Sequence, residues 1–154
     1  MAKLKFGSKG ASPGQFEYPW DVAVNSRGQI ACADSRNHRI QLFNPKGEFI
    51  SQYGFNSGTH HPVGIKHFDY PRGLCFDKKD QLYCTDFNLH RVLIINQQFN
   101  DARFIGSQGT TPGRFHRPQV SNSFTPFTAQ SQYRTNIFLF YLDFFYFVNY
   151  FYCK

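Results

Sequence analysis

The sequence contains little negative charge. Ten Asp and Glu residues stand against 17 Lys and Arg residues in a chain of 154, which gives a formal net charge of +7 at pH 7. A basic surface of this kind favours a polyanionic partner, with nucleic acid first and an acidic membrane second. Charge therefore indicates a class of partner, and it says nothing about the fold.

Cysteine is also sparse. The four cysteines are Cys32, Cys75, Cys84 and Cys153, and none of them forms a Cys-x-x-Cys pair. Zinc sites and dithiol redox sites typically contain such pairs. Three of the cysteines lie in apolar, strand-like runs, where a reduced cysteine behaves as a small hydrophobic residue. Residues 1–5 lead directly into polar, glycine-rich sequence and lack the apolar stretch of a secretory signal. These features favour a reducing, cytoplasmic compartment.

Catalytic groupings are missing as well. No His-x-His, His-x-x-His or carboxylate cluster accompanies the six histidines, and the pair His60-His61 stands alone. Such clusters hold the metal in metal-dependent enzymes. The glycine-rich segments lead into strands and lack Gly-Lys-Ser/Thr, so they do not predict a phosphate-binding loop. We expect no catalytic residue, no metal site and no cofactor in this chain.

What the sequence does contain is a repeat. The stretches FGSKGASPGQFEYP, from Phe6, and IGSQGTTPGRFHRP, from Ile105, share Gly-x-x-Gly-x-x-Pro-Gly-x-Phe-x-x-Pro with identical spacing. A third copy, from Tyr53 to Pro71, has five extra residues near positions 59–63. Self-similarity at a fixed period indicates a repeat architecture. Four further residues recur 52 positions later: Pro19, Asp34, His38 and Arg39 correspond to Pro71, Asp86, His90 and Arg91.

Each repeat unit is predicted to contain four short strands, because polar and apolar residues alternate between turn-forming segments. The predicted strands are 20–24, 29–33, 39–43 and 48–53, then 73–76, 81–85, 91–95 and 102–105. Four strands in a unit of this length are typical of a propeller blade. The predicted fold is all-β, a propeller fragment with two four-stranded antiparallel blades and the start of a third. We divide the chain into 1–52, 53–104, 105–120 and an aromatic tail, 121–154.

The repeated Asp…His-Arg residues are expected to build the blade. A short carboxylate near a strand usually satisfies backbone N–H groups, so Asp34 and Asp86 are predicted to serve as scaffold. His38 and His90 recur at one repeat position, which also favours a structural role over a ligand set.

The strings ADSRNHRIQLF and TDFNLHRVLII resemble the NHL repeat, named for its Asn-His-Leu-type core. Over residues 3–119 the consecutive segments resemble blades of the tripartite-motif NHL family, in particular its stem-cell and developmental-timing type. That resemblance implies a six-bladed propeller that binds mRNA hairpins on a basic face and represses translation or promotes decay. It also implies a RING ubiquitin-ligase module, of which these residues contain nothing. Leu89 departs from the repeat, because it stands where Asn37 stands in the first blade, so we expect the second loop to be set differently.

The candidate RNA surface is the propeller face on which the glycine-rich loops emerge together with the loops between second and third strands. Arginine and aromatic residues alternate there, and guanidinium groups bind phosphate while flat rings stack on bases. For Tyr18 and Trp20 the alternative is packing between blades. Arg117 is the first choice, because it matches an arginine that the family resemblance implies in RNA contact. The predicted RNA-binding residues are Arg117, Arg72, Arg36, Phe87, Tyr18, Trp20, Tyr70, Arg103 and Lys66.

These features together predict an RNA-binding propeller segment of a post-transcriptional repressor. The alternative is a protein-interaction propeller that recognises substrates or partners for a tripartite-motif ubiquitin ligase. We expect mRNA hairpins as the main partner, protein partners as a further possibility, and neither a small-molecule substrate nor a membrane.

The tail from residue 121 differs in composition from everything before it. Residues 137–153 contain ten Phe or Tyr in seventeen positions, with Asp143 and Asn149 among them. One interpretation is a membrane anchor, at the lower limit of length for a span. The other is translated intron sequence, because these residue types have A/T-rich codons. We expect the second, and we also expect the N-terminus to be cut, since Met1 falls within an outer strand.

Overall fold

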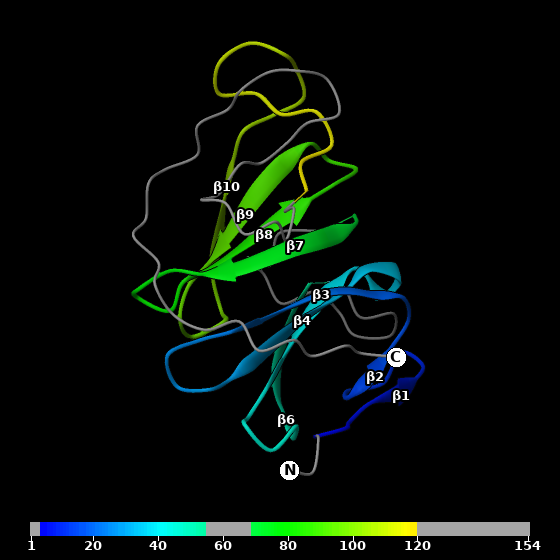
Figure 1. Cartoon of the computed structure of the whole chain (residues 1–154). Helices are drawn as coiled ribbons and strands as arrows, with labels where there is room; N and C mark the ends of the chain where they lie inside the picture. Colours follow the sequence, from blue (N-terminus) through cyan, green and yellow to red (C-terminus); the bar gives the residue numbers. More distant parts are fainter. Residues whose placement is uncertain (1–3, 55–68, 120–154) are drawn as a thin grey trace.

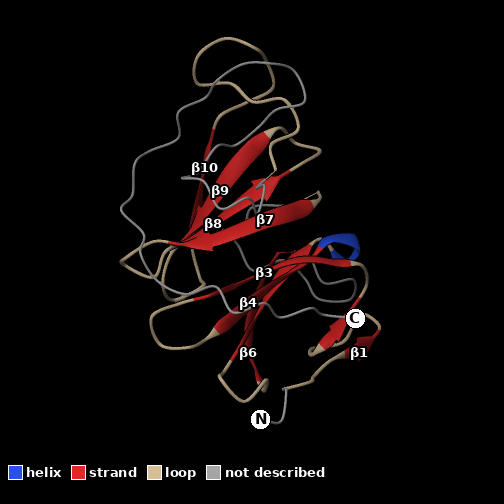
Figure 2. Cartoon of the chain, in the orientation of Figure 1, coloured by secondary structure: helices blue, strands red, loops and turns tan. Residues whose placement is uncertain are grey.

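The computed structural model describes residues 4–54 and 69–119 (Figure 1). In these ranges the chain forms two four-stranded antiparallel sheets, each with its strands in sequence order (Figure 2). The predicted all-β fold with four-stranded antiparallel blades is confirmed. The first blade consists of β3 (Pro19–Val24), β4 (Ile30–Asp34), β5 (Arg39–Phe43) and β6 (Phe49–Gly54), and the second of β7 (Pro71–Phe76), β8 (Leu82–Asp86), β9 (Arg91–Ile95) and β10 (Ala102–Ile105).

Each blade opens with a proline that faces an aspartate. Pro19 pairs with Asp34 and Pro71 pairs with Asp86, and a register irregularity follows the proline in both blades. A proline is tolerated at the first position of a strand because no ladder N–H is lost there. The first strands therefore begin one and two residues earlier than the alternation of polarity predicted.

The two blades pack together most closely at their inner strands, where β3 and β4 contact β7 (Figure 1). Strands β4 and β5 are buried along their whole length. The burial of apolar side chains from both blades supplies the main driving force for their association. The shared core contains Ala31, Ala33, Ile40, Leu42, Tyr53, Leu74, Phe76, Leu82, Cys84, Leu93, Ile95, Phe99 and Ala102.

A polar contact joins the blades at the turns between their first and second strands. Asp80, which is buried, accepts hydrogen bonds from the Ser26 backbone N–H (3.0 Å) and the Ser26 hydroxyl (2.7 Å). The half-exposed Arg27 guanidinium lies 3.5 Å from the same carboxylate. Burial alone raises the pKa of Asp80, but the two bonds from Ser26 and the charge of Arg27 outweigh it and lower the pKa. We name this contact the Ser26–Asp80 latch.

The glycine-rich loops close on themselves before the next blade begins. In the first loop, β1 (Ser8–Lys9) pairs in parallel with β2 (Gln15–Phe16), and the third loop repeats the contact as a bridge from Gln108 to Phe115. A Cβ atom on Gly106 would lie 2.1 Å from the Phe115 ring. Glycine is required there because the aromatic ring covers the backbone and because φ is +80°.

The loop between second and third strands differs between the blades, as predicted from Leu89. In the first blade it contains a short 3₁₀ helix, η1 (Ser35–Asn37), which the sequence pattern did not predict. The Asn37 side chain donates to Asp34 Oδ2 (2.8 Å) and to the Gly10 carbonyl (2.9 Å). In the second blade Leu89, at the position of Asn37, reaches the equivalent aspartate with its backbone N–H at 3.3 Å, and the loop is a turn. The insertion near 59–63, the tail and Met1 lie outside the described residues.

Candidate functional site

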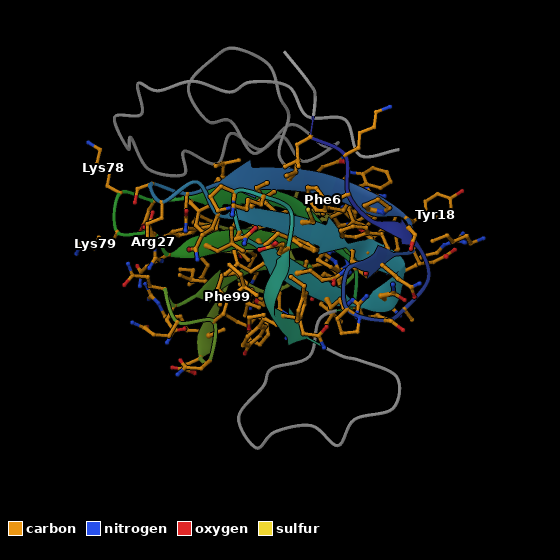
Figure 3. The ribbon with its side chains drawn as sticks, turned by 90° about the horizontal axis from the view of Figure 1, so that it is seen from below. Phe6, Tyr18, Arg27, Lys78, Lys79 and Phe99 are labelled. Atoms are coloured by element: carbon orange, nitrogen blue, oxygen red, sulfur yellow. The ribbon has the colours of Figure 1, made fainter. Side chains whose placement is uncertain are left out.

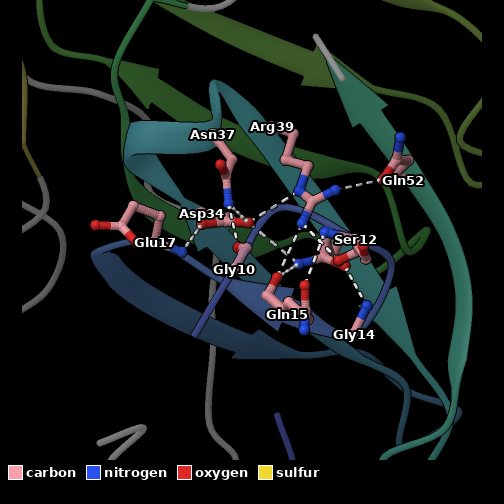
Figure 4. Close-up of polar contacts among 10 residues, drawn as sticks. Gly10, Ser12, Gly14, Gln15, Glu17, Asp34, Asn37, Arg39 and Gln52 are labelled. Atoms are coloured by element: carbon pink, nitrogen blue, oxygen red, sulfur yellow. Dashed lines mark hydrogen bonds and ion pairs between the residues drawn. The ribbon is translucent and has the colours of Figure 1, made fainter. Parts of the chain in front are cut away.

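A buried aspartate fixes the loops of the first blade (Figure 4). Asp34 is fully buried and accepts hydrogen bonds from the Glu17 backbone N–H (2.7 Å) and from the Asn37 side chain. Arg39, also fully buried, donates to Asp34 through Nε (2.9 Å) and to the Ser12 carbonyl through Nη2 (3.0 Å). The repeated Asp and Arg tie the glycine-rich loop to the strands, which confirms the predicted scaffold role.

The second blade uses its aspartate in the same way. Asp86 is fully buried and accepts from the backbone N–H groups of Asp69 and Tyr70, both at 3.2 Å. Arg91 Nη2 lies 3.5 Å from the carboxylate. Each aspartate therefore holds the backbone directly before the strand-opening proline, where the aromatic and arginine candidates begin.

Five of the predicted residues, from the starts of β3 and β7 and from the neighbouring loops, form one cluster, which we call the stack. The Arg72 guanidinium carbon lies 3.5 Å from the Phe87 ring centroid and 4.0 Å from the Trp20 centroid. Tyr70 meets Trp20 edge-on, with centroids 6.4 Å apart, and the Arg117 guanidinium carbon is 5.5 Å from the Phe87 centroid. Cations over aromatic faces attract each other electrostatically. Trp20, Arg72, Phe87 and Arg117 thus alternate ring and cation across the boundary between the blades.

A second, smaller pair lies beside η1. The Arg36 guanidinium carbon is 4.1 Å from the Tyr18 ring centroid, and the Arg36 guanidinium is 3.9 Å from the Glu17 carboxylate. Tyr18 is 57% exposed and adopts a left-handed backbone, with φ of 57°. It projects from the side of the molecule opposite to Lys78 (Figure 3).

Arg72 is the most constrained cation of the stack. Its Nη1 donates to Gln119 Oε1 at 3.1 Å, while its Nε is buried without a hydrogen-bond partner among the described residues. Burial lowers the pKa of Arg72, and the nearby Arg117 lowers it further. Arg117, by contrast, is exposed. The guanidinium of Arg72 is consequently enclosed by rings, and that of Arg117 is available to an anion.

Two predicted residues do not join these groups. Arg103 lies on β10, the last strand of the second sheet, where it pairs with Ile94 and acts electrostatically on Tyr83. Burial raises the pKa of that tyrosine, and Arg103 opposes the rise. Lys66 lies outside the described residues. The stack and the Tyr18–Arg36 pair together hold the other seven candidates.

The histidine of each repeat has a contact that sequence reasoning missed. His38 touches the Asp69 carbonyl oxygen, and the His90 ring accepts a hydrogen bond from the Arg117 backbone N–H at 3.0 Å. Both histidines have a left-handed backbone, with φ of 53°. The sequence shows that a histidine recurs directly before Arg39 and Arg91. It does not show that each histidine ring contacts the repeat that follows.

The described residues hold no group of three or more His, Cys, Asp or Glu side chains placed to bind a metal. In the same ranges, no helix has the length and apolar character needed to cross a membrane.

Comparison with known proteins supports the repeat assignment. The model of the NHL repeat matches residues 16–43. The chain is 29% identical to the B-box type zinc finger protein ncl-1 of Caenorhabditis elegans, with 66% of this chain and 17% of that protein covered. It is 30% identical to Protein brain tumor of Drosophila melanogaster, covering 62% and 13% respectively. It is 55% identical to the E3 ubiquitin-protein ligase TRIM71 of Bos taurus, covering 30% and 5%.

The chain thus spans less than a fifth of the length of each of these relatives. Among solved structures it is similar to virginiamycin B lyase from Staphylococcus aureus, with a TM-score of 0.49, 16% identity, and 70% of this chain and 32% of that chain covered. The repeated Asp…His-Arg residues and the four-stranded blades thus agree with the match to the NHL repeat at residues 16–43, and the chain is similar in sequence to tripartite-motif NHL proteins.

Proposed function

We propose that the loop face of this propeller segment binds RNA hairpins through their unpaired bases, as part of a post-transcriptional repressor in the cytoplasm. The observation that carries the proposal is the alternation of rings and guanidinium groups in the stack, repeated in the Tyr18–Arg36 pair. Unpaired bases stack on aromatic and guanidinium planes, and sequence-specific RNA recognition mostly targets such bases.

The exposed members of the two groups take different roles in this proposal. Trp20 is 49% exposed and Tyr18 is 57% exposed, so each offers a ring face or edge to a base. Arg117 is exposed and provides a guanidinium fork for phosphate. Arg72 is enclosed between two rings and acts by holding Trp20 and Phe87 at a fixed separation.

The resemblance to tripartite-motif NHL propellers supports this function, because it implies mRNA hairpins as ligands. The charge of the chain supports it as well, since +7 at pH 7 favours a polyanion. Arg103 and Lys66 remain predicted RNA contacts at the edge of the surface.

The test compares Arg117→Ala with Lys78→Ala, which also removes one positive charge but lies in the turn between β7 and β8, on the side opposite to Tyr18 (Figure 3). Binding of a labelled RNA hairpin is measured over a series of salt concentrations. Arg117→Ala should weaken binding and reduce the slope of log K against log salt by about 1. Lys78→Ala should leave both nearly unchanged. Equal effects of the two variants would refute the assigned face.

A second candidate function is recognition of a protein segment on the same face. Exposed Trp, Tyr and Arg side chains are the residue types that dominate protein interfaces, and Trp20, Tyr18 and Arg117 present all three. RNA hairpin binding with a steep salt dependence supports the first function. No RNA binding together with salt-sensitive binding of an acidic peptide, lost in Arg117→Ala, supports the second.

A further inference from the structure

Equivalent histidines of the two blades use the same ring nitrogen in opposite ways. His38 Nδ1 contacts the carbonyl oxygen of Asp69, so this nitrogen must donate. His90 Nδ1 faces the backbone N–H of Arg117 at 3.0 Å, so this nitrogen must accept. A ring nitrogen that accepts carries no proton, which places the proton of neutral His90 on Nε2.

The charged surroundings of the two rings also differ. His38 Nδ1 lies 3.7 Å from the carboxylate of Asp69. His90 instead packs beside His116, with ring centroids 5.2 Å apart, and close to the Arg117 guanidinium. Burial lowers the pKa of His90, His116 and Arg117 lower it further, and the Asp86 carboxylate on its own turn opposes them. These surroundings favour the neutral form of the His90 ring.

We propose that neutral His90 is the positioning residue for Arg117, and that its protonation in acid releases Arg117 from the stack. Arg117 has φ of 47°, directly before Pro118, in a backbone region that few non-glycine residues adopt. The hydrogen bond from its N–H to His90 holds this conformation, which carries the guanidinium toward Phe87.

Protonation reverses the contact. It puts an N–H on Nδ1, so two donors face each other where a hydrogen bond was, and it adds a positive charge next to the Arg117 guanidinium. In the first blade the same protonation would keep the donor to Asp69 and add charge beside a carboxylate. Acid thus loosens the loop of the third repeat while it leaves the His38 contact in place.

The first test needs no ligand. The ¹⁵N-labelled chain is titrated from pH 8 to pH 5, and the Arg117 amide and the His90 ring resonances are followed by NMR. We expect both to move with one midpoint, below the ordinary histidine value of about 6.5. In His90→Asn the side-chain oxygen still accepts, asparagine tolerates a left-handed backbone, and the amide of Arg117 should no longer titrate. The proposal would be overturned if the Arg117 amide resonance did not follow the titration of His90, or if it titrated equally in His90→Asn.

The second test rests on the proposed function and uses an RNA hairpin. The contribution of Arg117 is the ratio of the affinities of the wild type and Arg117→Ala, measured at pH 7.5 and pH 5.5 at constant salt. We expect this ratio to shrink by about fivefold or more in acid. It should not shrink in the His90→Asn background, and His38→Asn should behave like wild type. A ratio independent of pH would contradict the inference. Complete lack of RNA binding would refute the proposed function, and the NMR titration would still decide the role of His90.

Discussion

The two blades solve the same problem of burying an arginine in different ways. In the first blade Arg39 is completely buried, and its Nε lies 2.9 Å from Asp34. In the second blade the Arg91 side chain is 23% exposed, and it lies 3.5 Å from Asp86. Its guanidinium carbon instead sits 3.5 Å from the ring centroid of Phe104. In the first blade hydrogen bonds to Asp34 and its neighbours surround the cation, and in the second blade the cation has both an ion pair with Asp86 and a contact with an aromatic face.

This difference between Arg39 and Arg91 comes from the residues that surround each arginine. Arg39 donates to Gln52 Oε1 at 3.0 Å, and the residue at the equivalent position of the second blade is Phe104. Gln41, which donates to Asp34 at 3.2 Å, is replaced by Leu93. Exchange of polar partners for apolar ones removes hydrogen bonds and adds packing. The repeated Asp–Arg pair therefore marks the same backbone arrangement in both blades, but its contribution to the free energy of unfolding differs between them.

The largest expected effect comes from replacing the repeated arginine of each blade. Arg39→Met leaves the Asp34 carboxylate buried without its counter-charge, so we expect a loss of about 3–5 kcal/mol in the free energy of unfolding. Arg91→Met removes a longer, partly solvated ion pair and keeps an apolar stem over Phe104, so we expect about 1 kcal/mol. Urea unfolding of both variants measures the difference. Similar losses in the two variants would show that the hydrogen bonds around Arg39 add nothing to the free energy of unfolding.

A smaller effect concerns the Ser26–Asp80 latch. Asp80 adopts φ of 56° where the first blade has Gly28 at φ of 74°. Asp80→Gly relieves about 1 kcal/mol of left-handed strain but loses hydrogen bonds to a charged group, each of about 1.5–3 kcal/mol. Two bonds are lost, so we expect a net loss of about 2 kcal/mol. Ser26→Ala, which leaves the backbone unchanged, serves as the control.

The latch also predicts a pH dependence. The lowered pKa of Asp80 means that its contribution is complete above the unfolded value of about 3.9 and disappears as pH falls through the folded value. The stability advantage of wild type over Asp80→Gly should therefore disappear in strong acid, where only the relief of left-handed strain in the variant remains. An advantage of wild type that persists at pH 2 would assign the effect to the turn rather than to the carboxylate.

The smallest effect exchanges one loop residue between blades. Asn37→Leu removes donors to Asp34 and to the Gly10 carbonyl, and we expect it to cost about 1 kcal/mol. Leu89→Asn should gain a few tenths of a kcal/mol, about the value of a local side-chain bond at an exposed site. Thermal unfolding monitored by circular dichroism measures both. A loss in Leu89→Asn would mean that the second turn cannot adopt the geometry of η1.

The sequence alone predicted the sheets well and the site in part. Strand ends agreed within one or two residues, because alternation of polarity and the turns at Asn25, Asn44 and Asp77 are local signals. Arg103 shows the limit: its charge was read as part of the loop face, whereas its register with Ile94 puts it in the middle of β10. Side-chain direction on an outer strand depends on pairing, which composition does not encode.

The histidine contacts were unpredictable for a related reason. His38 and His90 are identical in sequence position and backbone conformation, yet their partners come from residues 31 and 27 positions away. Only packing of one blade against the next loop decides whether the ring meets Asp69 or Arg117. The same applies to Arg72, whose enclosure between Trp20 and Phe87 requires both blades.

The left-handed residues before Pro19 and before Pro118 have an evolutionary consequence. Tyr18 and Arg117 occupy this place with φ of 57° and 47°, although one carries a ring and the other a cation. The backbone there is held by neighbours, Asp34 through Glu17 and His90 through its ring, and not by the side chain itself. A single codon change at this position can alter the side chain that the loop exposes without changing these backbone contacts, so the exposed loop face is able to diversify one repeat at a time.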